Sequence, residues 1–233
     1  SYWNDGIHER NAVFDLYFRK MPFNSGYAVF NGLKRVVNFI ENFGFTNEDI
    51  TYLKSIGYEE DFLNYLKDLK FTGNIKSMQE GEICFGNEPL LRVEAPLIQA
   101  QLIETILLNI INFQTLIATK ASRIRQIATH DTLMEFGTRR AQEIDAALWG
   151  ARAAFIGGFD STSNVRAGKL FNIPVSGTHA HALVQTYGDE YIAFKKYAER
   201  HKNCVFLVDT FHTLKSGVPT AVSYTHLRAH ETK

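Results

Sequence analysis

The sequence predicts an α/β protein in which a mixed α+β amino-terminal domain is followed by an incomplete (β/α) barrel. Three observations support this fold class. The first hundred residues alternate short apolar runs with amphipathic segments of helical spacing. One long helical stretch follows, and beyond it four apolar runs each lead into a polar motif. Polar motifs at the carboxyl ends of successive strands are typical of parallel α/β folds, and four units are half of the roughly eight in a closed barrel.

Each element of the amino-terminal part follows from its local pattern. Strands are predicted where aromatic and branched residues cluster between turn residues, at 12–18, 27–30, 82–85 and 90–93. Helices are predicted where apolar residues recur on one face, at 32–43, from Asn47 onward, at 59–69 and at 96–128. We expect Asn47 to be the N-cap of the second of these helices.

Beyond residue 128 the pattern predicts βα units. The four apolar runs are residues 133–136, 154–156, 173–175 and 205–208, with helical segments between some of them at 141–153 and 189–200. We therefore expect three segments along the chain. These are an amino-terminal domain (1–96), the first part of a catalytic barrel domain (97–222), and a tail (223–233, SYTHLRAHETK) typical of vector or adaptor sequence.

Composition narrows the class of function. Acidic and basic residues balance at 25 each, which argues against nucleic-acid or anionic-membrane partners because these need a basic excess. The apolar stretch 97–118 carries six amide or carboxylate side chains, so it predicts a buried helix of a soluble protein and no membrane span. The chain opens without a signal-peptide pattern. Cys84 and Cys204 lie in apolar runs, which favours reduced thiols over a disulfide and a cytoplasmic location.

Two motifs could bind anions. GTRR places Arg139 and Arg140 after a predicted strand, where one guanidinium could hold a carboxylate or phosphate while the other pairs structurally. A solvated charge pair is the alternative. In GGFDSTSN, Asp160 and the hydroxyls from Ser161 onward could bind an anion at the start of a helix. The alternative there is a simple helix cap.

The motif SGTHAH (176–181) is the strongest candidate for a reactive centre. Its histidines, His179 and His181, would share one face if the backbone stayed extended. A metal pair would need further ligands, and no nearby ligand pattern supplies them. An imidazole beside the amides of Gly177 and Thr178 is suited to nucleophilic or general-base chemistry on a phosphorylated substrate. A lone histidine is equally compatible with a structural role.

Asp209 opens the last motif, DTFHT, where a carboxylate at a strand end could hold Mg²⁺ or a ribose hydroxyl, or could cap a helix. Taken in order, GTRRAQ, GGFDSTSN, PVSGTHAHALV and LVDTFHTLKSGVP closely resemble the motifs of nicotinate phosphoribosyltransferases. The segment AVFDLYFRKMPFNSGYAVFNGL (12–33) is similar to the amino-terminal domain of the same family. The resemblance covers residues 1 to about 222 and implies a barrel of the type II phosphoribosyltransferase kind.

The resemblance also implies a reaction. Nicotinate and phosphoribosyl diphosphate would give nicotinate mononucleotide and diphosphate for NAD biosynthesis, in a homodimer that uses ATP, Mg²⁺ and a transiently phosphorylated histidine. His181 matches the phosphorylated residue, Thr178 matches the residue that contacts nicotinate, and His179 takes a secondary position. We therefore predict His181 and Asp209 as catalytic residues. The predicted substrate-binding residues are Arg139, Arg140, Asp160, Ser161, Gly177 and Thr178, and no resident metal ligand is assigned.

Departures from the family pattern leave alternatives open. Where the family has Asp-Thr-Tyr-Asp-Thr, this chain has His212 in place of the second Asp. The family's opening Thr-Asp-Leu-Tyr-Gln, whose Tyr stacks on the pyridine ring, and the later barrel strands are absent from these 233 residues. The chain alone is therefore expected to be inactive. The complete protein could also be a relative that acts on nicotinamide or quinolinate.

Overall fold

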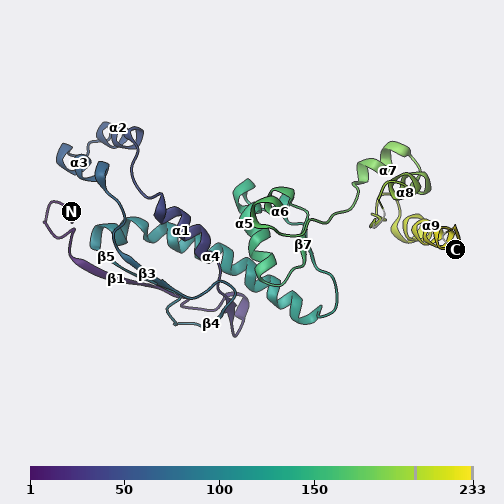
Figure 1. Ribbon diagram of the computed structural model, residues 1–233, viewed down its shortest axis with the longest axis horizontal. Coiled ribbons are helices and arrows are strands. Elements are labelled where there is room, and N and C mark those ends of the chain that lie inside the picture. The colour runs from purple at the N-terminus through teal and green to yellow at the C-terminus, as the bar shows by residue number, and fades with distance from the viewer. Residues whose placement is uncertain (202–203, 232–233) are drawn as a thin grey trace. The chain divides into compact units, whose positions relative to one another are not determined.

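The computed structural model describes residues 1–201 and 204–231, with side chains to residue 225 (Figure 1). The chain divides into two compact units, Ser1–Val175 and Ser176–Lys233. The predicted domain boundary between residues 96 and 97 lies inside the first unit, where a strand passes directly into the longest helix. That boundary stays a prediction, as does the non-native tail, whose predicted start at 223 lies within a continuous helix.

The first unit contains the seven strands assigned among the described residues. They are β1 (Asn11–Leu16), β2 (Ala28–Val29), β3 (Asn74–Ser77), β4 (Ile83–Cys84), β5 (Leu91–Pro96), β6 (Met134–Glu135) and β7 (Ser161–Thr162). Its helices are η1 (Pro22–Asn24), α1 (Leu33–Glu41), α2 (Asn47–Ser55), α3 (Glu60–Asp68), α4 (Leu97–Ile127), η2 (Thr138–Arg140), α5 (Glu143–Ile156) and α6 (Val165–Phe171). The second unit is helical in its described part, with α7 (His181–Tyr187), α8 (Glu190–Ala198), η3 (Thr213–Gly217) and α9 (Val218–Glu231).

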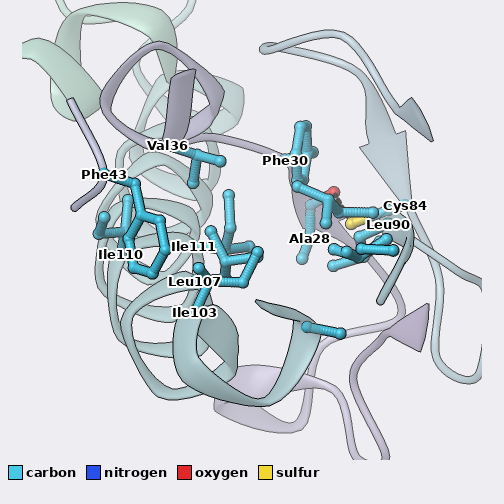
Figure 2. Close-up of a cluster of buried hydrophobic side chains, with 14 of the residues drawn as sticks. Ala28, Phe30, Val36, Phe43, Cys84, Leu90, Ile103, Leu107, Ile110 and Ile111 are labelled. Carbon is cyan, nitrogen blue, oxygen red and sulfur yellow. Dashed lines mark hydrogen bonds between the residues drawn. The ribbon is translucent and has the colours of Figure 1, made fainter. Parts of the chain in front are cut away.

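The main core of the first unit lies between an antiparallel sheet and the long helix α4. The sheet has the order β1-β5-β3, and β5 pairs with β1 from Asn11 opposite Pro96 to Leu16 opposite Leu91. Alternate residues of β5 are buried, as the two-residue period of a strand requires. Figure 2 shows Ile103, Leu107, Ile110 and Ile111 of α4 within the same cluster as Val36 and Phe43 of the α1 region.

Helix α4 is the one helix in the described part of the chain that is long and apolar enough to cross a membrane by length and composition. Its buried polar side chains make specific contacts with the segment that contains β2. The hydroxyl of Thr119 accepts a hydrogen bond from the Val29 N–H at 2.9 Å, and that of Thr115 bonds both backbone groups of Asn31 at 3.1 Å. These contacts provide hydrogen-bond partners for backbone groups beside the two-residue strand β2. Such contacts are typical of a helix in a protein core.

The α/β fold class is confirmed, including the parallel pairing after residue 128. β6 and β7 are parallel, with Met134 opposite Ser161, and a single parallel bridge joins Thr162 to Val175. The predicted strand at 154–156 is wrong, because these residues continue the alanine-rich helix α5 up to its cap at Gly157. The run 205–208 was also expected to be a strand, but in the described structure it has no ladder partner.

The predicted cap of α2 is wrong by one residue. Thr46 is the N-cap: its hydroxyl accepts from the Asp49 N–H at 3.1 Å, and the Asp49 carboxylate accepts from the Thr46 N–H at 2.7 Å. This reciprocal pair is a capping box. Asn47 is instead the first helical residue, since a Thr followed three residues later by an acid satisfies two of the free N–H groups at once.

Candidate functional site

The candidate residues of the first unit follow the parallel strands β6 and β7. Arg139 and Arg140 lie on η2, directly after β6, and both are exposed. Neither side chain makes a hydrogen bond or ion pair with the described residues, so the expectation that one guanidinium pairs structurally is wrong; the Arg140 backbone N–H donates to the Gly137 carbonyl at 2.9 Å. Arg140 borders a cleft of about 370 Å³ that Lys120 and Glu135 also line. Two cationic groups at one cleft can attract an anionic ligand.

The turn that presents these arginines is held by Glu135, the last residue of β6. One carboxylate oxygen accepts a hydrogen bond from the Gly137 N–H, and the other accepts from the Thr162 hydroxyl at 2.6 Å. The acid therefore ties the end of β6 to the end of β7. This role of Glu135 leaves no local signal in the sequence, because the residue lies inside an apolar run and its partner in β7 is 27 residues away.

Asp160 has a clear structural partner set. Its Oδ2 accepts hydrogen bonds from the Leu133 N–H at 2.7 Å and from the Arg125 guanidinium at 2.5 Å. The Leu133 N–H and the Arg125 guanidinium hold the pKa of Asp160 below its usual range. This carboxylate joins the end of α4 to the segments that carry β6 and β7. Its predicted contact with substrate stays a prediction.

The neighbouring hydroxyl of Ser161 differs from that of Thr162. Ser161 is buried, and its Oγ has no hydrogen-bond partner among the described residues. A buried hydroxyl without a partner is unusual and leaves capacity for a ligand or water. The helix cap expected in this motif is provided by Asn164, whose Oδ1 accepts from the Ala167 N–H at 3.0 Å at the start of α6.

In the second unit, His181 is the accessible histidine of its motif. Its Nδ1 lies 3.1 Å from the hydroxyl of Thr210, and its Nε2 lies 3.8 Å from the Asp209 carboxylate. The side chains of His181 and Asp209 are 45% and 56% exposed, so a solute can reach both. The structure thus brings the two predicted catalytic residues together. Thr210, which the motif analysis passed over, lies directly beside them.

His179 is oriented the opposite way. Its ring is buried among Phe194, Tyr197 and Phe206, with the closest ring centroid, that of Tyr197, at 4.9 Å. Its Nε2 accepts a hydrogen bond from the Leu207 N–H at 3.0 Å. The expectation that both imidazoles share one face is wrong, because the extended backbone ends at Ala180 and α7 begins at His181.

The remaining motif residues complete the description of this turn. The hydroxyl of Thr178 donates to the His179 carbonyl at 2.9 Å, and Gly177 is exposed with open space around its Cα. His212 is the N-cap of η3, where its Nδ1 accepts from the Lys215 N–H at 3.2 Å. An Asp at this position would fit the same capping role, since Asp is a preferred N-cap residue.

The described part of the chain also bears on metal binding. It contains no group of three or more His, Cys, Asp or Glu side chains that could hold a metal ion. Both cysteines are free thiols, with Cys84 buried and Cys204 half-buried. Burial raises the pKa of Cys84 to about 11, which keeps that thiol protonated and unreactive near neutral pH.

Comparison with known proteins places this geometry in context. Residues 1–112 match the family model described as the nicotinate phosphoribosyltransferase (NAPRTase) N-terminal domain. The chain is 66% identical over 223 residues to nicotinate phosphoribosyltransferase of Bacillus subtilis, covering 95% of this chain and 46% of that protein. The protein of the same name from Dictyostelium discoideum is 38% identical, with 95% and 45% covered. The chain therefore spans about half the length of the curated relatives it matches.

Solved structures agree with the sequence comparison. Human nicotinic acid phosphoribosyltransferase matches with a TM-score of 0.84 and 30% identity, covering 94% of this chain and 54% of that one. A nicotinate-nucleotide pyrophosphorylase from Pyrococcus furiosus matches with a TM-score of 0.78 and 27% identity, covering 97% and 50%. The enzyme of that name from Ehrlichia chaffeensis, at 15% identity and a TM-score of 0.54, with 86% and 59% covered, shares the fold.

Proposed function

This chain belongs to the nicotinate phosphoribosyltransferase family, and we propose that the complete protein makes nicotinate mononucleotide and diphosphate from nicotinate and phosphoribosyl diphosphate. We further propose that ATP hydrolysis is coupled to this reaction through phosphorylation of His181. The observation that carries the second proposal is the contrast between the two histidines of one motif. His181 is accessible beside a carboxylate, whereas the imidazole of His179 is buried and already hydrogen-bonded.

The geometry around His181 favours one ring nitrogen as the nucleophile. The Asp209 carboxylate lies on the Nε2 side of the ring, where it stabilises a proton on that nitrogen. The lone pair is then on Nδ1, and the Thr210 hydroxyl can donate a hydrogen bond to it and orient the ring before ATP binds. The hydroxyl must release that lone pair before Nδ1 can act as the nucleophile. In the proposed step, Nδ1 attacks the γ-phosphorus of ATP. The N–P bond forms as the bond from phosphorus to the bridging oxygen breaks, and ADP leaves with that electron pair.

Asp209 would also be the protein ligand for Mg²⁺. Magnesium is usually held by one or two carboxylates together with substrate phosphates and water. Asp160 is committed to Arg125 and Leu133, whereas Asp209 makes no hydrogen bond within the described residues. With Asp209 as its protein ligand, Mg²⁺ would supply neutralisation of phosphate charge.

The substrate-binding roles are proposed for side chains with unused bonding capacity. The guanidinium groups of Arg139 and Arg140 are exposed and unpaired in the described structure, which suits them to carboxylate and phosphate groups. Ser161 offers a hydroxyl without a partner. Gly177 and Thr178 border the reactive histidine in the chain, and Gly177 leaves room for a ligand to approach the backbone.

Radiolabel transfer tests the proposal in the complete enzyme that contains this sequence. With γ-³²P-ATP, label should be bound to the protein in an acid-labile form and be lost in His181→Ala. His130→Ala is the matched control, because His130 is exposed and has no described interaction partner. Antibodies that distinguish the two phosphohistidine isomers should detect the Nδ1 form. Label that survives His181→Ala would exclude this residue as the acceptor.

Two further measurements test the substrate and the state of this chain. Nicotinate should be converted by the complete enzyme, and neither nicotinamide nor quinolinate should replace it; conversion of either in its place would favour the alternative enzymes. The 233-residue chain alone should form no mononucleotide, since it spans about half the length of its relatives. Measurable synthesis by the chain alone would contradict this expectation.

A further inference from the structure

We propose that His179 is a positioning residue, whose neutral imidazole holds the segment 204–209 in the orientation that brings Asp209 to His181. This inference rests on the proposed role of His181 and goes beyond it. It assigns a function to the buried histidine, which is neither a second phosphoacceptor nor a metal ligand. All the contacts that carry it lie within the second unit, in its described residues.

The hydrogen bonds of His179 identify its tautomer. Because the Leu207 N–H can only donate, the Nε2 that accepts from it at 3.0 Å must carry a lone pair. The proton of the neutral ring is therefore on Nδ1, where it can donate to the Ala180 carbonyl at 3.3 Å. Burial lowers the pKa of His179 below its ordinary value, which agrees with a neutral ring.

The His179 ring provides a hydrogen-bond acceptor for the backbone N–H of Leu207. Residues 204–209 have no ladder partner in the described structure, so their N–H groups lack the usual acceptors of a sheet. The imidazole supplies one acceptor in the middle of this segment. Phe206, next to Leu207, stacks on Phe194 of α8 with a centroid distance of 4.8 Å, and the His179 ring contacts both. The segment is thus fixed by one hydrogen bond and one aromatic cluster.

The bond between His179 and Leu207 affects His181 because only a few residues separate each bonded residue from the catalytic groups. Asp209 follows Leu207 by two residues and Thr210 follows by three, and His181 follows His179 by two. The bond between His179 and Leu207 therefore cross-links the two segments immediately before the groups that meet. Loss of the bond would leave the 204–209 segment held by the aromatic cluster alone. A displacement of about 1 Å can reduce a rate on the order of a hundredfold.

A pair of substitutions in the complete enzyme separates positioning from packing. His179→Gln keeps an acceptor near the position of Nε2, whereas His179→Leu keeps apolar volume and removes the acceptor. We expect His179→Leu to slow phosphorylation of His181 on the order of tenfold to a hundredfold and His179→Gln to restore most of the rate. Phe194→Leu is the matched comparison, since it loosens the same cluster without removing the hydrogen bond, and it should slow labelling clearly less than His179→Leu does.

¹⁵N NMR of the same enzyme, labelled selectively in histidine and leucine, provides a test that does not depend on ATP. The His179 ring should show a proton on Nδ1, and the Leu207 amide should exchange faster in His179→Leu than in His179→Gln. If the parent enzyme takes up label and the two His179 variants are labelled at equal rates, the inference is overturned and the proposed function stands. If the parent enzyme takes no label, the phosphohistidine proposal fails. The NMR result then decides the inference: a proton on Nε2 of His179 would refute it.

Discussion

The buried ion pair between Glu80 and Arg152 offers the sharpest stability test of this fold. Both charged side chains are largely buried, at 15% and 13% exposure, and Arg152 bonds both carboxylate oxygens, at 2.6 and 2.9 Å. Glu80 also accepts a hydrogen bond from the Gly32 N–H at 2.9 Å, just before α1. The acid therefore links the segment before α1 to α5. We predict that Glu80→Gln destabilises the first unit substantially.

The magnitude follows from what glutamine can replace. Its carbonyl oxygen can still accept from the Gly32 N–H, but its amide NH₂ would face the Arg152 guanidinium, leaving a buried positive charge unpaired. Breaking one partner of a buried pair costs about 3–5 kcal/mol, and the residual exposure of both groups favours the lower end, about 3 kcal/mol. The matched control is Glu94→Gln, whose partner Lys76 is 69% exposed, and it should cost less than about 1 kcal/mol.

The pH dependence of the free energy of unfolding provides a second, independent test of the Glu80–Arg152 pair. Burial alone would raise the pKa of Glu80, but the hydrogen bonds from Arg152 and Gly32 outweigh it and lower the pKa below its ordinary 4.5. A depressed acid pKa contributes stability above the unfolded value and loses it as pH falls through the folded value. The gap between the parent and Glu80→Gln should therefore narrow below about pH 4.5. Urea unfolding followed by circular dichroism measures both effects, and equal losses for Glu80→Gln and Glu94→Gln would refute the reasoning.

Three other predictions use single positions. Thr46→Ala should lower the free energy of unfolding by about 1 kcal/mol and Asn47→Ala by clearly less, and the reverse order in urea titrations would contradict the assigned cap. Gly217→Ala should disrupt the second unit, because a Cβ there would overlap the Val208 carbonyl oxygen; unchanged proteolytic resistance would argue against that packing. A thiol reagent at pH 8 should modify Cys84 only after unfolding, since its pKa is raised to about 11 and its side chain is buried; rapid native labelling would contradict this burial.

Elements with strong periodicity could be predicted from the sequence. β1 and the helices α1, α3 and α4 lie within one to three residues of their predicted bounds, because each buries one face against a single core. The short strands after residue 128 were harder to predict from the sequence. β7 begins only at Ser161, since the apolar residues before Gly157 complete a helix turn that an alanine-rich sequence favours.

The candidate site was predicted in part for a related reason. Asp209 and His181 are both predicted as catalytic residues, and the structure places their side chains 3.8 Å apart. No local pattern showed that Asp160 is occupied by Arg125, 35 residues earlier in the chain. Partners distant in sequence leave no local pattern. The start of α7 was also hidden, because Ala180 occupies the cap position without a side-chain hydrogen bond, so no Ser, Thr, Asp or Asn marked the boundary.

That unmarked boundary explains why two histidines in one motif have different chemistry. In an extended strand, residues two apart point to the same side, and the two rings would compete for one environment. The helix start at His181 turns the second ring away from the first, so His179 enters the aromatic cluster while His181 stays accessible beside Asp209. The buried ring must then remain neutral, since protonation of Nε2 would place two donors face to face at Leu207. The ring of His181 instead faces the Thr210 hydroxyl and the Asp209 carboxylate, and neither of these is a fixed N–H donor.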